Sequence, residues 1–272
     1  MIPIRDINPT SRTAWLTLVL IVANVAVFLL WEPTFEGPEE QQEFFFCNAQ
    51  IAFETTNQTT LADGGAEARR AITESFGAGE SEAAGLQDFL EQTCPEKSWL
   101  GSVFVSMFLH GGWLHLAGNM LFLWVFGNNV EDRLGRFTYL LFYVLGGLAA
   151  TGLQVAFDPN SAVPNVGASG AIAAILGSYL VMFPKARIHT LVIFFFITFL
   201  ELPATFVLLA WFVLQLFSGV GGMGNQLGGG VAYWAHVGGF VFGSAVTWLF
   251  FRSRGRPDPY VLPPPPPPSY PY

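Results

Sequence analysis

Polar side chains are scarce in the long apolar stretches of this 272-residue chain, and a few of them have the types and spacing of a catalytic site. A polar or ionisable side chain is costly inside a bilayer, so each one found there is a candidate functional residue. The candidates are His110, His115, Asn119, Ser169, Glu201 and His236. Together they can supply a nucleophile, a base and hydrogen-bond donors, which are the components of acyl transfer.

Ser169 and His236 are predicted to form a catalytic dyad. A serine hydroxyl becomes a useful nucleophile when a base removes its proton, and an imidazole can be that base and later protonate a leaving amine. No carboxylate occupies the apolar stretches near His236, so the sequence predicts a Ser/His dyad rather than a triad.

His115 and Asn119 are four residues apart, so they share one face of a helix. A tetrahedral oxyanion needs donors, and an imidazole N–H, an Asn amide and the backbone N–H of Ser169 can provide them. We expect these groups to line the oxyanion site. On a continuous helix, His110 would lie on a different face from His115, and the Gly111-Gly112 pair makes helix continuity from His110 doubtful. A structural role is therefore expected for His110.

Small residues surround the predicted dyad and allow two helices to approach closely. They are Ala171, Ala173, Ala174 and Gly177 after the serine, and Gly239 and Gly243 after the histidine. Taken alone, a serine in an apolar helix usually bonds the carbonyl four residues back, and a G-x-x-x-G pattern usually means packing only. The His115/Asn119 pair, the serine segment and the histidine segment occur in this order in three predicted spans. Their combination favours a catalytic site over three unrelated packing features.

The elements that must position these residues are membrane helices. The chain is 52% hydrophobic and only 12% charged, with a mean hydropathy of +0.45, which indicates an all-α polytopic membrane protein. Six spans are predicted, at 13–31, 103–126, 137–156, 167–184, 190–218 and 231–251. The fifth stretch is too long for one crossing, and Leu202-Pro203 is expected to separate a short entry segment from the helix proper.

Charge divides the chain into regions. Segment 32–98 carries 14 acidic and three basic residues, whereas the short segments that flank the spans carry Lys and Arg on one side only. The sequence therefore predicts a cytoplasmic N-terminus (1–12), a six-helix membrane domain (13–252) with an acidic extracytoplasmic insert (32–98), and a Pro-rich cytoplasmic tail (253–272), in the plasma (inner) membrane. The sequence contains no basic patch of the kind that binds nucleic acid, so nucleic-acid binding is not expected.

Three features of the water-exposed segments leave alternatives open. Cys47 and Cys94, both in the insert, either form a disulfide or are two unrelated thiols. Residues 62–86 are rich in Ala, Gly and Glu and are expected to be flexible or marginally helical. The tail is expected to be a solvated polyproline segment, with a proline-reading domain as a less favoured partner.

The motifs resemble those of the rhomboid family of intramembrane serine proteases. The matching elements are His110-x4-His115-x3-Asn119, Glu131 in Val130–Gly135, Gly167-Ala-Ser169-Gly170 and Ala235-His236-x2-Gly239-x3-Gly243. The resemblance implies a six-helix bundle in which Ser169 is the nucleophile, His236 the base, and His115 and Asn119 oxyanion donors. By the same resemblance, His110 braces the outer loop and Glu131 the inner end of the second helix.

One position departs from the family pattern, because Ala173 stands where many members have an aromatic residue beside the catalytic histidine. Tyr233 or Trp234 is expected to orient His236 instead. The resulting hypothesis is an endopeptidase without a cofactor that cleaves transmembrane segments whose helices are weakened by Gly or Pro. Substrate is expected to enter between the second and fifth helices, and the stretch Gly219–Gly230 is expected to act as a cap.

Two alternative functions remain open from the sequence. The first is a catalytically inactive relative that binds transmembrane helices, which the presence of both Ser169 and His236 disfavours. The second is a transporter or metal conduit with histidine ligands, which lacks an H-E-x-x-H pair and evident inverted repeats.

Overall fold

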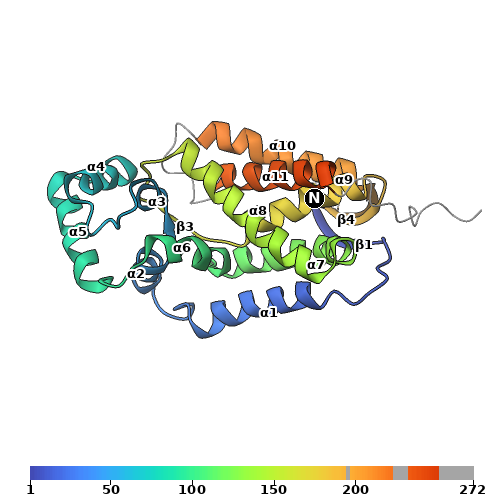
Figure 1. Cartoon of the computed structure of the whole chain (residues 1–272), viewed down its shortest axis with the longest axis horizontal. Helices are drawn as coiled ribbons and strands as arrows, with labels where there is room; N and C mark the ends of the chain where they lie inside the picture. Colours follow the sequence, from blue (N-terminus) through green and yellow to red (C-terminus); the bar gives the residue numbers. More distant parts are fainter. Residues whose placement is uncertain (194–196, 223–231, 251–272) are drawn as a thin grey trace, which may run out of the picture.

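The computed structural model describes residues 1–193, 197–222 and 232–250, and within these ranges the chain is mostly helical (Figure 1). Most of the Gly-rich stretch Gly219–Gly230 and the whole tail 253–272 lie outside the described residues. Their expected roles as a cap and as a solvated tail therefore stay predictions.

A bundle of long helices forms the main body of the molecule. Its members are α1 (Trp15–Leu30), α7 (Trp113–Leu134), α8 (Arg136–Phe157), α9 (Ser169–Met182), α10 (Ala204–Gly222) and α11 (Tyr233–Phe250). Helix α9 is central, since it packs against α7, α8 and α11 and its residues from Gly170 to Tyr179 are all buried. The candidate serine thus begins the most enclosed helix of the bundle.

Length and composition identify α8 as the one described helix that could cross a membrane unaided. The bent pair formed by α6 (Trp99–Val105) and the 3-10 turn Ser106–Phe108 with α7 would make a second span. Helices α1, α9 and α10 are apolar but shorter. The mostly helical prediction is confirmed, whereas the count of six spans stays a prediction.

The predicted second span is broken rather than continuous. Residues Trp99–Phe108 and Trp113–Leu134 meet at an angle of 76°. Gly112, between them, has a φ of +140°, which a side chain would disfavour. The expected loss of helix continuity beside His110 is confirmed, and this histidine lies in the connecting segment.

The predicted fifth span begins with strands. Strands β4 (Arg187–Ile193) and β5 (Ile197–Pro203) form an antiparallel hairpin, and β1 (Ile2–Asp6) pairs with β4, so that the sheet order is β1-β4-β5. Helix α10 then starts directly after Pro203, as predicted. The all-α prediction is wrong for this segment, because an apolar run rich in β-branched and aromatic residues fits a strand as well as a helix.

The acidic insert is a small folded unit with a core of its own. It contains α2 (Pro38–Asn48), β2 (Gln50–Ile51), α3 (Ala52–Asn57), α4 (Gly65–Phe76) and α5 (Glu80–Thr93). Of the two alternatives for residues 62–86, the helical one agrees with the structure, in which α4 and α5 bury Ala68, Ile72 and Leu90 against Phe46 and Phe53. Tertiary packing stabilises helices that their composition alone would leave marginal.

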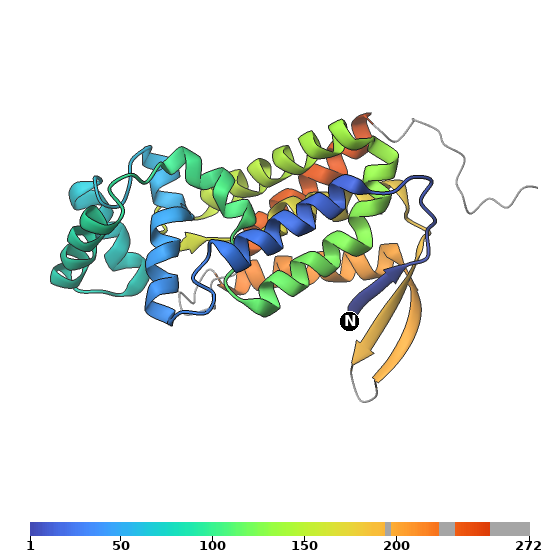
Figure 2. The same cartoon turned by 90° about the horizontal axis from the view of Figure 1, so that it is seen from below.

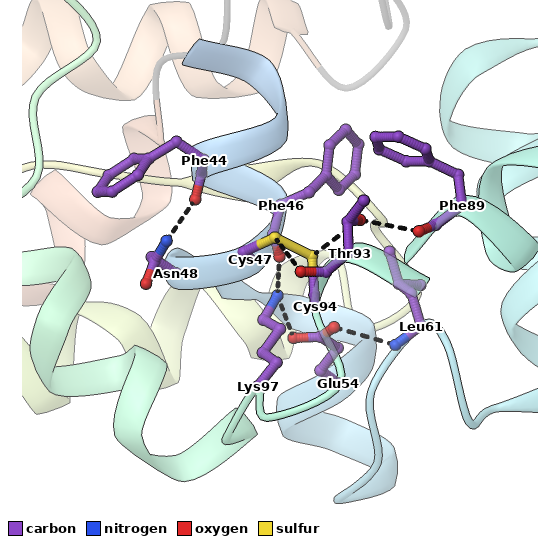
Figure 3. The surroundings of a disulfide bond; sticks show 10 residues. All are labelled: Phe44, Phe46, Cys47, Asn48, Glu54, Leu61, Phe89, Thr93, Cys94 and Lys97. Atoms are coloured by element: carbon purple, nitrogen blue, oxygen red, sulfur yellow. Dashed lines mark hydrogen bonds and ion pairs between the residues drawn. A yellow bond between two sulfur atoms is a disulfide. The ribbon is translucent and has the colours of Figure 1, made fainter. Parts of the chain in front are cut away.

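A disulfide and a buried ion pair hold the insert together (Figure 3). Cys47 and Cys94 are bonded, with their Cα atoms 5.1 Å apart, which decides between the two alternatives that the sequence left open. Lys97 Nζ lies 2.8 Å from Glu54 Oε2, and both side chains are almost fully buried. Burial lowers the pKa of Lys97 and raises that of Glu54, while the opposite charge of each partner counteracts these shifts.

The insert and the three-stranded sheet lie at opposite ends of the bundle (Figure 2). Strand β2 of the insert also pairs with β3 (Pro164–Asn165), which precedes α9. The insert is thereby joined to the segment that leads into Ser169.

Candidate active site

Ser169 is the first residue of α9, two positions after a glycine with a positive φ angle. Gly167 has a φ of +130°, a value that residues with a side chain rarely adopt. The first N–H groups of a helix have no partner within it, and the helix dipole favours negative charge at that end. The backbone N–H of Ser169 therefore lies where an oxyanion would be stabilised.

Helices α9 and α11 approach so closely that glycine is required between them. A methyl group at Gly239 would overlap the carbonyl oxygen of Gly170, and one at Gly243 would overlap that of Ala174. The predicted packing role of both glycines agrees with this geometry. Their absent side chains allow the start of α9 to lie beside the first turn of α11.

This close packing places the serine beside the candidate base. The Oγ of Ser169 lies 2.7 Å from Nε2 of His236, although the two residues are 67 positions apart in the sequence. Both residues are partly buried. The structure therefore brings the two side chains to the hydrogen-bonding distance that the predicted chemistry requires.

Gln215, which the sequence reasoning missed, holds the other side of the His236 ring. Its Oε1 lies 2.6 Å from Nδ1 of His236. An amide oxygen only accepts hydrogen bonds, so Nδ1 carries the proton and the lone pair of Nε2 faces Ser169. Gln215 thus fixes the tautomer that a general base needs, without a carboxylate.

The expected orienting residues do not hold the imidazole. Trp234 instead stacks on Phe157, with ring centroids 3.8 Å apart. The aromatic ring beside His236 belongs to Trp211 of α10, at a centroid distance of 5.8 Å. The expectation for Tyr233 or Trp234 is wrong, because the two α10 residues reach the ring from the neighbouring helix.

His115 presents a donor toward the serine. Its Nδ1 accepts a hydrogen bond from the backbone N–H of Gly111 at 3.2 Å, which leaves the proton of the neutral ring on Nε2. A methyl group at Gly167 would lie 2.9 Å from this Nε2 and 3.3 Å from Ser169 Oγ. Glycine therefore keeps open a space between the two groups, at the distances an oxyanion would occupy.

Asn119 lies one turn below His115 on α7 and is 7% exposed. Among the described residues, its Nδ2 has no hydrogen-bond partner. A buried, unpaired amide donor is costly, and sites that bind a negatively charged group are one place where such a donor is found.

His110 is buried in the segment before α7 rather than aimed at the serine. Its backbone N–H donates to the carboxylate of Glu32 at 3.0 Å, and its Nδ1 donates to the carbonyl of Phe108 at 3.1 Å. Burial raises the pKa of Glu32 to about 7, an effect that the hydrogen bond from His110 opposes. These contacts agree with a bracing role for His110.

Glu131 caps the start of α1. Its carboxylate accepts hydrogen bonds from the backbone N–H groups of Leu16 and Thr17, at 3.0 and 2.7 Å, and from the Thr17 hydroxyl at 2.8 Å. A negative group at a helix N-terminus is favourable, so Glu131 fastens α7 to α1. The expected bracing of this end of α7 agrees with that arrangement.

A cavity of about 40 Å³ adjoins Ser169, which is enough for water. Its polar lining includes the side chains of Gln50, Gln154 and Asn165. Gln154 also accepts a hydrogen bond from the backbone N–H of Ala235, and Gln50 accepts one from Asn165 at 2.9 Å. The insert therefore contributes a side chain to the wall of the candidate site.

Known proteins resemble this chain over most of the region described above. The sequence model of the Rhomboid domain matches residues 97–253. RHOMBOID-like protein 6, mitochondrial, of Arabidopsis thaliana is 28% identical over 79% of this chain and 67% of its own length. Rhomboid protein 1, mitochondrial, of Saccharomyces cerevisiae is 28% identical over 56% of this chain and 42% of its own.

A shorter match with a higher identity is Rhomboid protease GluP of Bacillus subtilis, which is 42% identical over 26% of this chain and 14% of its own length. The chain thus spans less than half of the yeast and Bacillus relatives that it matches.

Proposed function

The chain belongs to the rhomboid family, and on that premise we propose that it is an intramembrane serine endopeptidase. Rhomboid proteins are integral to membranes, and the proposed substrates are the transmembrane segments of other proteins. The observation that carries the proposal is the 2.7 Å approach of Ser169 Oγ to His236 Nε2 at the end of a buried helix.

The proposed reaction begins when Ser169 Oγ attacks the peptide carbonyl carbon and its proton passes to Nε2 of His236. Hydrogen bonds from His115 Nε2, Asn119 Nδ2 and the backbone N–H of Ser169 stabilise the oxyanion. His236 then protonates the leaving amine as the C–N bond breaks. Water from the cavity, deprotonated by His236, hydrolyses the acyl-enzyme and regenerates the serine. These steps need no metal or cofactor.

A six-span bundle is part of the proposal, with α1, α7, α8, α9, α10 and α11 as the spans. The N-terminal residues 1–12 and the tail 253–272 would lie in the cytoplasm, and the insert 32–98 outside, at a plasma (inner) membrane. The disulfide supports this orientation, because disulfides persist in oxidising compartments. A proline-reading partner for the tail remains a minor part of the hypothesis.

Substrate entry is proposed to occur between α7 and α10. Helix α10 packs mainly against α11, and its described aromatic contact with α7 is the pair Phe122 and Trp211, at a centroid distance of 6.4 Å. A helical substrate hides its carbonyls in its own hydrogen bonds, so segments with Gly or Pro that unwind readily should be preferred.

The decisive experiment compares cleavage of a model transmembrane substrate in proteoliposomes by the wild type and by Ser169→Ala. We expect the variant to lose at least 1000-fold in kcat/KM, and a fluorophosphonate probe to label Ser169 in the wild type. Ser178→Ala is the matched control, since Ser178 lies on the same helix and bonds Thr247 rather than His236. Equal cleavage by the wild type and Ser169→Ala would refute the nucleophile. An inactive wild type that still captures the substrate would favour the catalytically silent alternative.

A further inference from the structure

The hairpin β4–β5 exposes an unusual number of apolar side chains for a connection between two helices. Ile193 is 56% exposed, Ile197 74% and Phe199 67%. Every residue described in β5 except Leu202 is exposed. An exposed, apolar edge strand promotes aggregation unless something covers it.

The register shows that one face of the hairpin is entirely apolar in its distal half. Ile193 pairs with Ile197 and Leu191 with Phe199, which places these four side chains on one face. The other face carries Val192 and Leu200, each paired with a threonine, Thr198 and Thr190. Since a water-exposed face of a sheet is normally polar, an exposed apolar face beside a second face without charges in this half indicates an apolar environment.

The proximal half of the hairpin is charged. Lys185, Arg187 and Arg5 are exposed there, and His189 Nε2 lies 3.8 Å from Glu201. The hairpin is therefore cationic and polar at its base and apolar toward its tip. The same division occurs in segments that lie in a membrane interface, with the cations near lipid phosphates.

The orientation of the hairpin fits this division. It leaves the end of the bundle opposite the insert and extends across the direction of the helices rather than along it (Figure 2). In a membrane crossed by the bundle, it would thus run along the lipid surface. Its apolar side chains continue into the exposed Phe206 and Leu209 of α10.

We propose that the hairpin Arg187–Pro203 is an interfacial lipid anchor, seated in the leaflet on the side opposite the insert. The exposed side chains of Ile193, Ile197 and Phe199 enter the boundary between headgroups and acyl chains, and the basic residues at the base of the hairpin contact anionic headgroups. The open edge of β5 keeps it out of the hydrocarbon centre, where unpaired backbone groups are too costly. This inference rests on the proposed membrane bundle but not on catalysis.

The anchor is tested with nitroxide spin labels on single added cysteines in the full-length, disulfide-bonded protein. Ile197→Cys and Phe199→Cys report on the hairpin, and Glu67→Cys, on the exposed face of α4, is the matched water-facing control. The proteins are reconstituted in vesicles of phosphatidylcholine with one quarter phosphatidylglycerol, and collision with oxygen is compared with collision with a water-soluble nickel chelate.

We expect the hairpin labels to collide several-fold more with oxygen than with the chelate, and the Glu67→Cys label to show the reverse. Removing phosphatidylglycerol, or introducing Lys185→Gln with Arg187→Gln, should make the hairpin labels shallower. Labels at position 197 or 199 that collide with the chelate as often as the one at position 67 would overturn the anchor. Spin–spin broadening between two copies would overturn it as well, in favour of a strand-paired dimer. Cleavage measured on the same vesicles separates this result from the fate of the proposed peptidase.

Discussion

The core of the insert is filled by large side chains, whereas the contact between α9 and α11 depends on residues that have none. Phe46, Phe53 and Leu61 are at most 3% exposed in the insert. At the helix pair, the backbones themselves meet at Gly239 and Gly243. The two regions therefore solve the packing problem in different ways.

The difference is the one expected if the insert lies in water and the bundle in lipid, as proposed above. In water, burial of apolar surface drives folding, so large side chains, a disulfide and an ion pair stabilise a small unit. In lipid that driving force between helices is absent, and close backbone approach supplies van der Waals contact instead. Substitutions that add volume should therefore affect α9 and α11 most, and loss of a cross-link should affect the insert most.

The largest expected effect comes from adding volume at the helix contact. Gly239→Val should reduce kcat/KM at least 1000-fold, since a Cβ there overlaps the carbonyl oxygen of Gly170 and pushes His236 away from Ser169. Gly152→Val on α8 is the matched control, because a Cβ at Gly152 meets nothing within 4 Å. Comparable activity in the two variants would show that the contact is not tight.

Loss of the disulfide should act on the insert and spare the helix contact. Cys47 and Cys94 are 47 residues apart, so Cys47→Ser with Cys94→Ser should destabilise the insert by about 4 kcal/mol. Amide hydrogen exchange should show faster opening of α4 and α5, with unchanged protection in α9. Equal loss of protection in α9 would contradict the independence of the two regions.

Glu32, the first residue of the insert, should make the stability of the folded protein depend on pH. Its pKa is about 7 in the folded protein and ordinarily about 4.5, so the folded state binds the extra proton and is stabilised at the lower pH. As pH rises from 4.5 to 7, the wild type should lose up to roughly 3 kcal/mol relative to Glu32→Gln. Thermal unfolding in detergent at several pH values checks this, and parallel curves for the two proteins would refute it.

The smallest effect is expected at the link between the two regions. Gln50→Ala leaves Asn165 without its side-chain partner and should lower kcat/KM several-fold, about 1 kcal/mol. Asn165→Ala should cost a similar amount, and the double variant no more than either alone. The side chain of Gln41 donates to the carbonyl of Pro33 and does not line the cavity beside Ser169, so Gln41→Ala should leave kcat/KM unchanged.

The contact between Ser169 and His236 could be predicted from the sequence, because each residue lies in a short motif whose small neighbours indicate close helix packing. Gln215 was not predicted, although a lone amide in the apolar stretch 204–217 is the signal that could have found it. Gln215 lies outside the motifs that carry the family resemblance, and its partner His236 is 21 residues away in the sequence.

The packing of the insert and the strands of the hairpin depend on contacts that composition does not contain. Composition made residues 62–86 appear weakly structured, because the stabilising contacts come from Phe46 and Phe53, which lie outside that segment. The run 190–203 is apolar enough for a helix, and pairing of β4 with the N-terminal strand is a long-range contact that hydropathy does not contain.

The wall formed by Gln50 connects the candidate site, which helices enclose, to the folded insert. In the proposed orientation, a binding protein raised against the insert, such as an antibody fragment, would hold the unit that supports this wall without entering lipid. Control from outside the bilayer would then require no competition with the substrate.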